Sequence, residues 1–155
     1  MKTVREIMTP DPAICTPDSP IPELARLMVE FDCGAIPVVD SEDEPRPIGI
    51  VTDRDIVCRL VAEGLNPLDC DAADCMTTPG ITVPVDSDVS AARDLLLRNH
   101  IRRLVVIDGN GFCCGMVSLA DLVRETSDAS VVRELSEPTE AASKVQENVK
   151  EPEPV

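Results

Sequence analysis

The chain contains a repeated unit, and this repetition constrains its fold more than any other feature. Three separated segments recur at one constant spacing, which is the distance along the sequence from Met8 to Met76. They are Met8-Thr9, which recurs as Met76-Thr77; Asp18-Ser19, which recurs as Asp86-Ser87; and Ile36-Pro37-Val38-Val39, which recurs as Leu104-Val105-Val106-Ile107. A constant spacing over several elements indicates a duplicated structural unit rather than chance similarity.

Each copy contains a glycine and two apolar residues, followed by a hydroxyl residue and, three positions later, an aspartate. The first copy has Gly49-Ile50-Val51-Thr52-Asp53-Arg54-Asp55, and the second has Gly115-Met116-Val117-Ser118-Leu119-Ala120-Asp121. The pattern predicts a buried strand that leads directly into a helix, with Thr52 and Ser118 as the helix N-caps. If Gly49 recurred at the same spacing as the other segments, its counterpart would lie two positions after Gly115. The loop between the two preceding strands is therefore two residues shorter in the second copy.

Hydrophobic periodicity predicts the order β-α-β-β-α in each copy. In the first copy we expect a helix over about Ile21 to Phe31, with Leu24, Leu27, Met28 and Phe31 on one face, and a last helix over Asp53 to Val61. Such a small unit exposes one face of its sheet, so two copies should pack together. The predicted fold is α+β, with two β-α-β-β-α units related by a pseudo-twofold axis and packed sheet to sheet. The units would span residues 1–67 and 68–125, and residues 126–155 would form an acidic, disordered or partly helical tail.

Composition excludes several classes of partner. The formal net charge of −15 argues against duplex nucleic acid and anionic membrane surfaces, and aromatic residues, at 1%, are too few for base stacking. No apolar run approaches the length of a membrane span, and the N-terminus lacks a signal-peptide pattern, so we expect a cytoplasmic protein. The seven cysteines include no C-x-x-C pair, and His100 is the single histidine, which argues against a zinc site.

The two units and their Gly-x-Val-[Thr/Ser]-x-x-Asp motifs resemble a tandem CBS-domain pair, also called a Bateman module. The resemblance covers about Val4 to Arg124 and includes the strand that begins at Arg102-Arg103. It implies adenine nucleotides or other adenosyl ligands bound in two clefts between the units, with the aspartate on the ribose hydroxyls and the hydroxyl residue near the ribose or α-phosphate. It also implies that each motif faces the other copy. The first cleft would comprise Thr52, Asp55, Gly80, Ile81, Arg102 and Arg103, and the second Ala13, Ile14, Gly34, Ala35, Ser118 and Asp121.

The two implied clefts differ in charge. Arg102 and Arg103 correspond to Gly34 and Ala35 at the spacing that relates Met76 to Met8. Arginine provides forked donors for phosphate, so we expect the Thr52/Asp55 cleft to bind AMP, ADP or ATP. The other cleft would bind an uncharged or shorter adenosyl ligand or stay empty. S-adenosylmethionine and NAD remain open as ligands, and no covalently bound cofactor is expected.

A simpler explanation of each motif also remains open, because a hydroxyl residue followed three positions later by an acid can be a capping box. Capping boxes prefer Glu or Gln, and Asp is short for the reach back to the N-cap.

Three functional hypotheses follow. The first is a regulatory sensor of adenine nucleotides that acts on a separate protein, because the resemblance leaves no second domain. The second is a structural or dimerisation protein with vestigial clefts. The third is a thiol redox-responsive protein that uses Cys33 or Cys113-Cys114. We expect no enzymatic activity, because neither a nucleophile–base pair nor a phosphate-binding glycine loop is evident. The resemblance also implies a homodimer.

Overall fold

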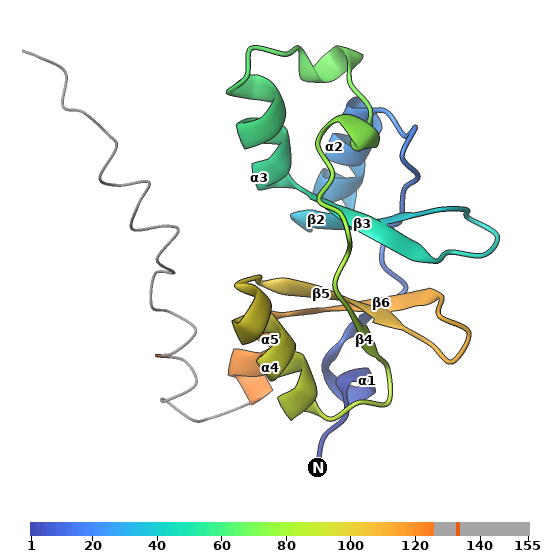
Figure 1. The fold of residues 1–155 in the computed structure, drawn as a ribbon, viewed down its shortest axis with the longest axis vertical. Helices are drawn as coiled ribbons and strands as arrows, with labels where there is room; N and C mark the ends of the chain where they lie inside the picture. Colours follow the sequence, from blue (N-terminus) through green and yellow to red (C-terminus); the bar gives the residue numbers. More distant parts are fainter. Residues whose placement is uncertain (126–132, 134–155) are drawn as a thin grey trace, which may run out of the picture.

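The fold is that of a computed structural model, which describes residues 1–125 and residue 133. Our expectation for the tail, residues 126–155, therefore lies almost wholly outside the described residues. The described chain forms two halves stacked on each other (Figure 1). Each half contains a sheet, its helices and a separate aliphatic core. The predicted arrangement of two α+β units is confirmed.

The first unit contains a two-stranded antiparallel sheet of β2 (Ala35–Val39) and β3 (Pro47–Thr52). Helix α2 (Ile21–Glu30) precedes the sheet and α3 (Asp53–Ile56) follows it. Two short 3-10 helices, Pro67–Asp69 and Ala72–Asp74, lead toward the second unit. The buried residues of this core are Cys15, Ile21, Leu24, Ile36, Val38, Val51, Leu60, Ala72 and Cys75.

The second unit contains a four-stranded sheet in the order β1-β6-β5-β4. Its strands are β1 (Thr9–Pro10), β4 (Thr82–Pro84), β5 (Arg103–Ile107) and β6 (Cys113–Ser118), and its helices are α1 (Val4–Ile7), α4 (Val89–Asn99) and α5 (Leu119–Glu125). The buried core residues are Val4, Val83, Val85, Ala92, Leu96, Leu104, Val106, Val117 and Leu122. Burial alternates along the end of β6 with the period of two that a strand buried on one face requires.

The first residues of each copy pack on the other copy. Helix α1 lies in the same half as α4 and α5 (Figure 1), where Val4 is fully buried in the second core and β1 pairs with β6. Reciprocally, Ala72 and Cys75 are buried in the first core, and Thr77 pairs with Ile50 of β3. The boundary between the units at residue 67 therefore remains a prediction. In space, the first residues of each sequence copy belong to the other unit.

One expected detail of the helices is wrong, and another is confirmed with a change of geometry. Phe31 does not lie on the buried face of the first helix, because α2 ends at Glu30 and Phe31 is its C-cap residue. Phe31 is instead 53% exposed. The helix predicted over Asp53 to Val61 is confirmed in its bounds, but it consists of two parts. After Ile56 it continues as a π-helix, Val57–Val61, in which Ala62 N donates to Val57 O at 2.9 Å.

Contacts between the two hairpin loops link the units on one side. Cys113 N donates to Pro45 O at 2.7 Å, and the Arg46 guanidinium lies 4.8 Å from the centre of the Phe112 ring. Arg46 Nη1 also donates to Asn110 O at 3.0 Å. A cation over an aromatic face adds a modest attraction at such a site. The loops that differ in length between the copies thus contact each other directly.

None of the helices in the described part of the chain is both long enough and apolar enough to cross a bilayer.

Candidate functional site

A pocket of about 940 Å³ lies between the two units. Residues 31–35 of the first unit form one side of it, and residues 102–103 and 116–121 of the second unit form another. The segment 9–13, which joins β1 to the first unit, also lines it. Because segments of both units meet there, the pocket is sensitive to the relative position of the units.

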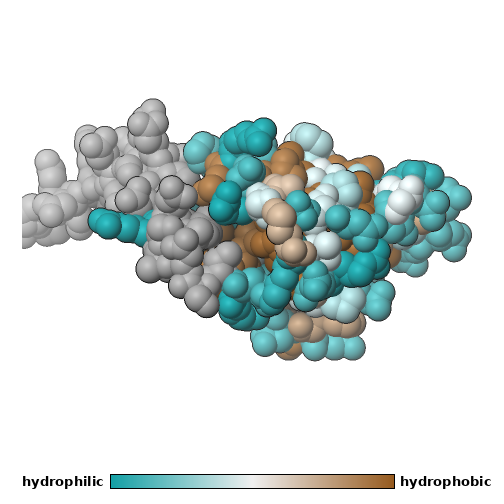
Figure 2. Space-filling view, turned by 90° about the horizontal axis from the view of Figure 1, so that it is seen from below, coloured by the Kyte–Doolittle hydropathy of each residue, from teal (hydrophilic) through white to brown (hydrophobic). Residues whose placement is uncertain are grey.

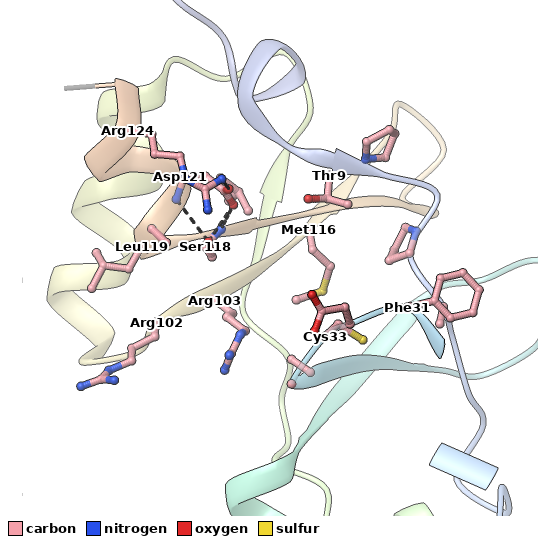
Figure 3. A pocket seen from close by; sticks show the side chains of 18 of the residues that line it. Thr9, Phe31, Cys33, Arg102, Arg103, Met116, Ser118, Leu119, Asp121 and Arg124 are labelled. Atoms are coloured by element: carbon pink, nitrogen blue, oxygen red, sulfur yellow. Dashed lines mark hydrogen bonds and ion pairs between the residues drawn. The ribbon is translucent and has the colours of Figure 1, made fainter. Parts of the chain in front are cut away.

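Ser118 and Asp121 lie at the second-unit side of the pocket (Figure 3). Asp121 Oδ2 accepts from Ser118 N at 2.7 Å and from Ser118 Oγ at 2.7 Å, and Asp121 N donates to Ser118 Oγ at 3.2 Å. The other carboxylate oxygen, Oδ1, lies 3.6 Å from Nη1 of the exposed Arg124. A carboxylate oxygen accepts more than one hydrogen bond, so Oδ1 can still accept from a ligand hydroxyl.

The two arginines do not lie where we expected them. Both Arg102 and Arg103 line the pocket that contains Ser118 and Asp121, whereas we had assigned them to the Thr52/Asp55 cleft. The reason is the antiparallel pairing of β5 with β6, in which Arg103 is opposite Ser118. In a hairpin, the start of one strand lies beside the end of the other. Arg102 and Arg103, at the start of β5, therefore lie beside the Ser118 motif at the end of β6.

The side chains of the two arginines point in different directions (Figure 3). Arg103 points toward the first unit, where its Nη2 lies 3.2 Å from the position that a Cβ on Gly34 would occupy. Arg102 points away from it and is exposed. A side chain at position 34 would therefore crowd the Arg103 guanidinium.

The Thr52 motif has the same internal bonds but does not line this pocket. Asp55 Oδ2 accepts from Thr52 N at 2.9 Å, and Asp55 N donates to Thr52 Oγ1 at 3.0 Å. Both motifs are therefore capping boxes in this structure, as the simpler explanation that we left open requires, and the shorter side chain of Asp does make this reach. Capping uses one carboxylate oxygen in each case and leaves the other for a further partner.

The remaining predicted residues are divided between several places. Ala13, Gly34 and Ala35 line the pocket together with Ser118 and Asp121, but Ile14 does not. Gly80 and Ile81 also lie away from it. Gly80 packs against Gly49, with 3.2 Å between its ideal Cβ position and Gly49 Cα, and Ile81 packs on the second core.

Several lining residues were not anticipated from the sequence. Asp11 and Asp32 reach the pocket from turns in which both have left-handed backbone, with φ of 47° and 48°. Arg124 reaches it from the last turn of α5, and its position three residues after Asp121 was a usable signal. The described lining thus contains three carboxylates (Asp11, Asp32, Asp121) and three guanidinium groups (Arg102, Arg103, Arg124).

Two of the three thiols proposed for a redox function, Cys113 and Cys114, are poorly activated. Burial raises the pKa of the Cys113 thiol from 9.0 to about 11, and burial likewise raises the pKa of Cys114. Since the thiolate is the reactive form, such cysteines are weak nucleophiles at neutral pH. Among the described residues, no cluster of three or more His, Cys, Asp or Glu side chains could hold a metal ion.

We expect Cys113 to react with iodoacetamide about 100-fold more slowly at pH 8 than a thiol of ordinary pKa, because its thiolate fraction is about 100-fold lower. Its rate should rise about tenfold per pH unit until the pH reaches about 11. Mass spectrometry of the labelled chain, with the exposed Cys58 as the internal control, measures both rates. Rapid labelling of Cys113 at pH 7 would revive the redox hypothesis.

Comparison with known proteins identifies the repeated unit. The CBS domain family model matches residues 4–62 and 72–128. The protein MK0525 of Methanopyrus kandleri is 37% identical over 122 residues, which are 79% of this chain and 61% of that protein, so this chain spans less than two thirds of that relative. The CBS domain-containing protein YhcV of Bacillus subtilis is 34% identical over 131 residues, covering 84% of this chain and 90% of YhcV. Among solved structures, the CBS domain protein PAE2072 of Pyrobaculum aerophilum, complexed with AMP, superposes with a TM-score of 0.69 at 28% identity, covering 87% of this chain and 98% of that one.

Proposed function

This chain belongs to the CBS-domain family, and we propose that it is a regulatory sensor that binds an adenine nucleotide in the pocket between its two units. The observation that most supports this proposal is the meeting of Asp121, Ser118 and Arg103 in one pocket that also contacts the first unit. The AMP complex of PAE2072, a protein of the same fold, supports the ligand class.

Each of these side chains has a chemical task in the proposed complex. Asp121 Oδ1 accepts hydrogen bonds from the ribose hydroxyls, as an ionised carboxylate with no donors of its own can do. Ser118 lies at the N-terminus of α5 and contacts the ribose or phosphate. Arg103 donates to the phosphate, and a charge-assisted bond of this kind is about twice as strong as a neutral one.

The charge of the pocket favours a monophosphate. Its three carboxylates offset its three guanidinium groups, so a ligand with several phosphates meets no net positive charge. We therefore propose AMP rather than ATP as the preferred ligand, and we assign it to the Ser118/Asp121 side. This reverses the preference that we stated from the sequence, because the arginines accompany that motif.

The proposed output is a change in how the units pack. A ligand that contacts both units favours the arrangement in which those contacts form, and it can shift the equilibrium only by its differential affinity for the two arrangements. A separate protein in the cytoplasm would respond to the shift, and the proposal includes no catalytic step.

We also propose that the chain forms a homodimer through its first unit. Apart from Met1, the large exposed apolar residues of the described chain lie within residues 29–68, among them Val29 (84% exposed), Val57 (57%) and Leu68 (72%). The opposite end of the molecule, where the N-terminus lies in the half of the second unit, instead shows apolar surface interrupted by many hydrophilic side chains (Figure 2). Light scattering that finds only monomer at micromolar concentration would contradict the dimer.

Thermal unfolding with AMP tests the main proposal. At a ligand concentration one hundred times Kd, the folded state should gain about 2.7 kcal/mol, which raises the midpoint of unfolding. Inorganic phosphate at the same concentration is the control for a general anion effect. If AMP, ADP, ATP, adenosine, S-adenosylmethionine and NAD all leave the midpoint unchanged, the structural hypothesis with vestigial clefts is favoured instead.

A further inference from the structure

The two motifs are alike in sequence but differ in what surrounds the second aspartate oxygen. Asp55 Oδ1 accepts a long hydrogen bond from Thr77 Oγ1 at 3.5 Å and lies 3.8 Å from Arg59 Nε. The Asp55 side chain is 14% exposed and that of Asp121 is 16% exposed, so the difference between the motifs lies in these contacts and not in burial. Groups of the chain itself therefore surround the oxygen that would accept from a ribose hydroxyl.

Arg59 is held at several points. Its Nη1 donates to Met76 O at 3.0 Å and to Cys75 O at 3.3 Å, in addition to the Asp55 contact. Arg59 belongs to the π-helix Val57–Val61, and insertions of this kind are frequent where a helix serves a special local purpose. Arg59 thus joins the helix after the first motif to the segment that leads into the second unit.

Backbone bonds hold the same segment on the motif strand. Ile50 N donates to Thr77 O at 3.0 Å, and Thr77 N donates to Ile50 O at 2.9 Å. Thr77 O also lies 2.7 Å from the position that a Cβ on Gly49 would occupy, so the two backbones are in direct contact. The same backbone pairing joins Thr9 to Met116 beside the second motif, so it fixes the segment next to each motif but does not distinguish the two.

The side-chain partners of the second aspartate oxygen differ between the two units. Glu125 is the counterpart of Arg59, at the spacing that relates Gly115 to Gly49, and its charge prevents an attractive contact with Asp121; it pairs instead with Lys2. Thr9, the counterpart of Thr77, lines the pocket, and no hydrogen bond joins it to Asp121 in the described chain. The nearest cation to Asp121 Oδ1 there is Arg124, whose side chain is 78% exposed.

We infer that each chain binds one adenine nucleotide, at Asp121, and that Asp55, Arg59 and Thr77 form a clamp that holds residues 75–77 on the first unit. The identity of Arg59 and Glu125 decides which of the two like motifs is open to ligand. The ligand half of this inference rests on the proposed function, whereas the clamp half does not.

Isothermal titration of the full chain with AMP tests the ligand half, using the matched variants Asp55→Asn and Asp121→Asn. We expect one AMP per wild-type chain, a loss of affinity of about 10- to 100-fold for Asp121→Asn, and a change of less than about threefold for Asp55→Asn. Two AMP molecules per chain, or equal losses in the two variants, would overturn the single-site inference while leaving the proposed function intact. Absence of AMP binding in the wild type would overturn both.

Thermal unfolding without ligand tests the clamp separately. Arg59→Ala should lower the midpoint by about 2–8 °C, because it removes contacts to two carbonyl oxygens and a largely buried carboxylate. Arg124→Ala is the matched control, since it removes only the exposed partner of Asp121, and its midpoint should stay within about 1 °C. An equal effect of the two substitutions would show that Arg59 does not clamp the segment.

Discussion

Replacement of Leu104 by alanine should lower the free energy of unfolding by about 2–5 kcal/mol. Leu104 is fully buried on β5, in the second core. The cost has two parts, the lost transfer of the side chain out of water and the cavity that remains. The surrounding residues have little freedom to move into this cavity, because β5 is paired with β4 on one side and with β6 on the other.

Urea unfolding followed by circular dichroism measures this change, with Leu68→Ala as the control. Leu68 is the same residue type but is 72% exposed, so its removal should change stability by no more than about 0.5 kcal/mol. A small effect of Leu104→Ala would mean that the second core is loosely packed, which conflicts with the burial of its neighbours Val83 and Val117.

The repeat was enough to predict the fold, because local patterns and long-range spacing agree in this chain. The strand–helix motif and its cap recur in both copies, so the pattern in one copy supports the pattern in the other. Within the described residues, the leading strand expected in each copy is present only in the second, as β4, whereas the first copy has an isolated bridge between Cys15 and Val38. Exchange of the leading segments between units could not be found in this way. Thr9 pairs with β6 and Thr77 with β3 in the same manner, so the spacing between copies is identical with or without exchange.

The site was harder to predict than the fold. Spacing showed that Arg102 and Arg103 have no charged counterparts at Gly34 and Ala35, and this contrast is real. The spacing between the copies does not show which of the two motifs lies beside the start of β5. The pairing of Arg103 with Ser118 in the β5–β6 hairpin shows that it is the second motif. Arg59 was missed because two of its partners are backbone oxygens at Cys75 and Met76, which leave no mark in a sequence. Its position four residues after Asp55 was nevertheless a usable signal.

Replacement of Arg103 by alanine should weaken AMP binding by about 10- to 100-fold, the factor that corresponds to losing one charge-assisted bond of about 1.5–3 kcal/mol. Arg103 is half-buried and points toward the first unit, whereas Arg102 is exposed and points away (Figure 3). Arg102→Ala is therefore the matched control, and we expect it to change the dissociation constant by less than about threefold, as for a screened surface charge.

Adenosine separates a phosphate contact from a general disturbance of the pocket. If Arg103 binds the phosphate, Arg103→Ala should weaken AMP but leave the affinity for adenosine, which has no phosphate, nearly unchanged. Calorimetry with both ligands on both variants measures the difference directly. Equal losses for AMP and adenosine would instead mean that Arg103 supports the shape of the pocket, through its position over Gly34, and that the phosphate depends on another cation such as Arg124.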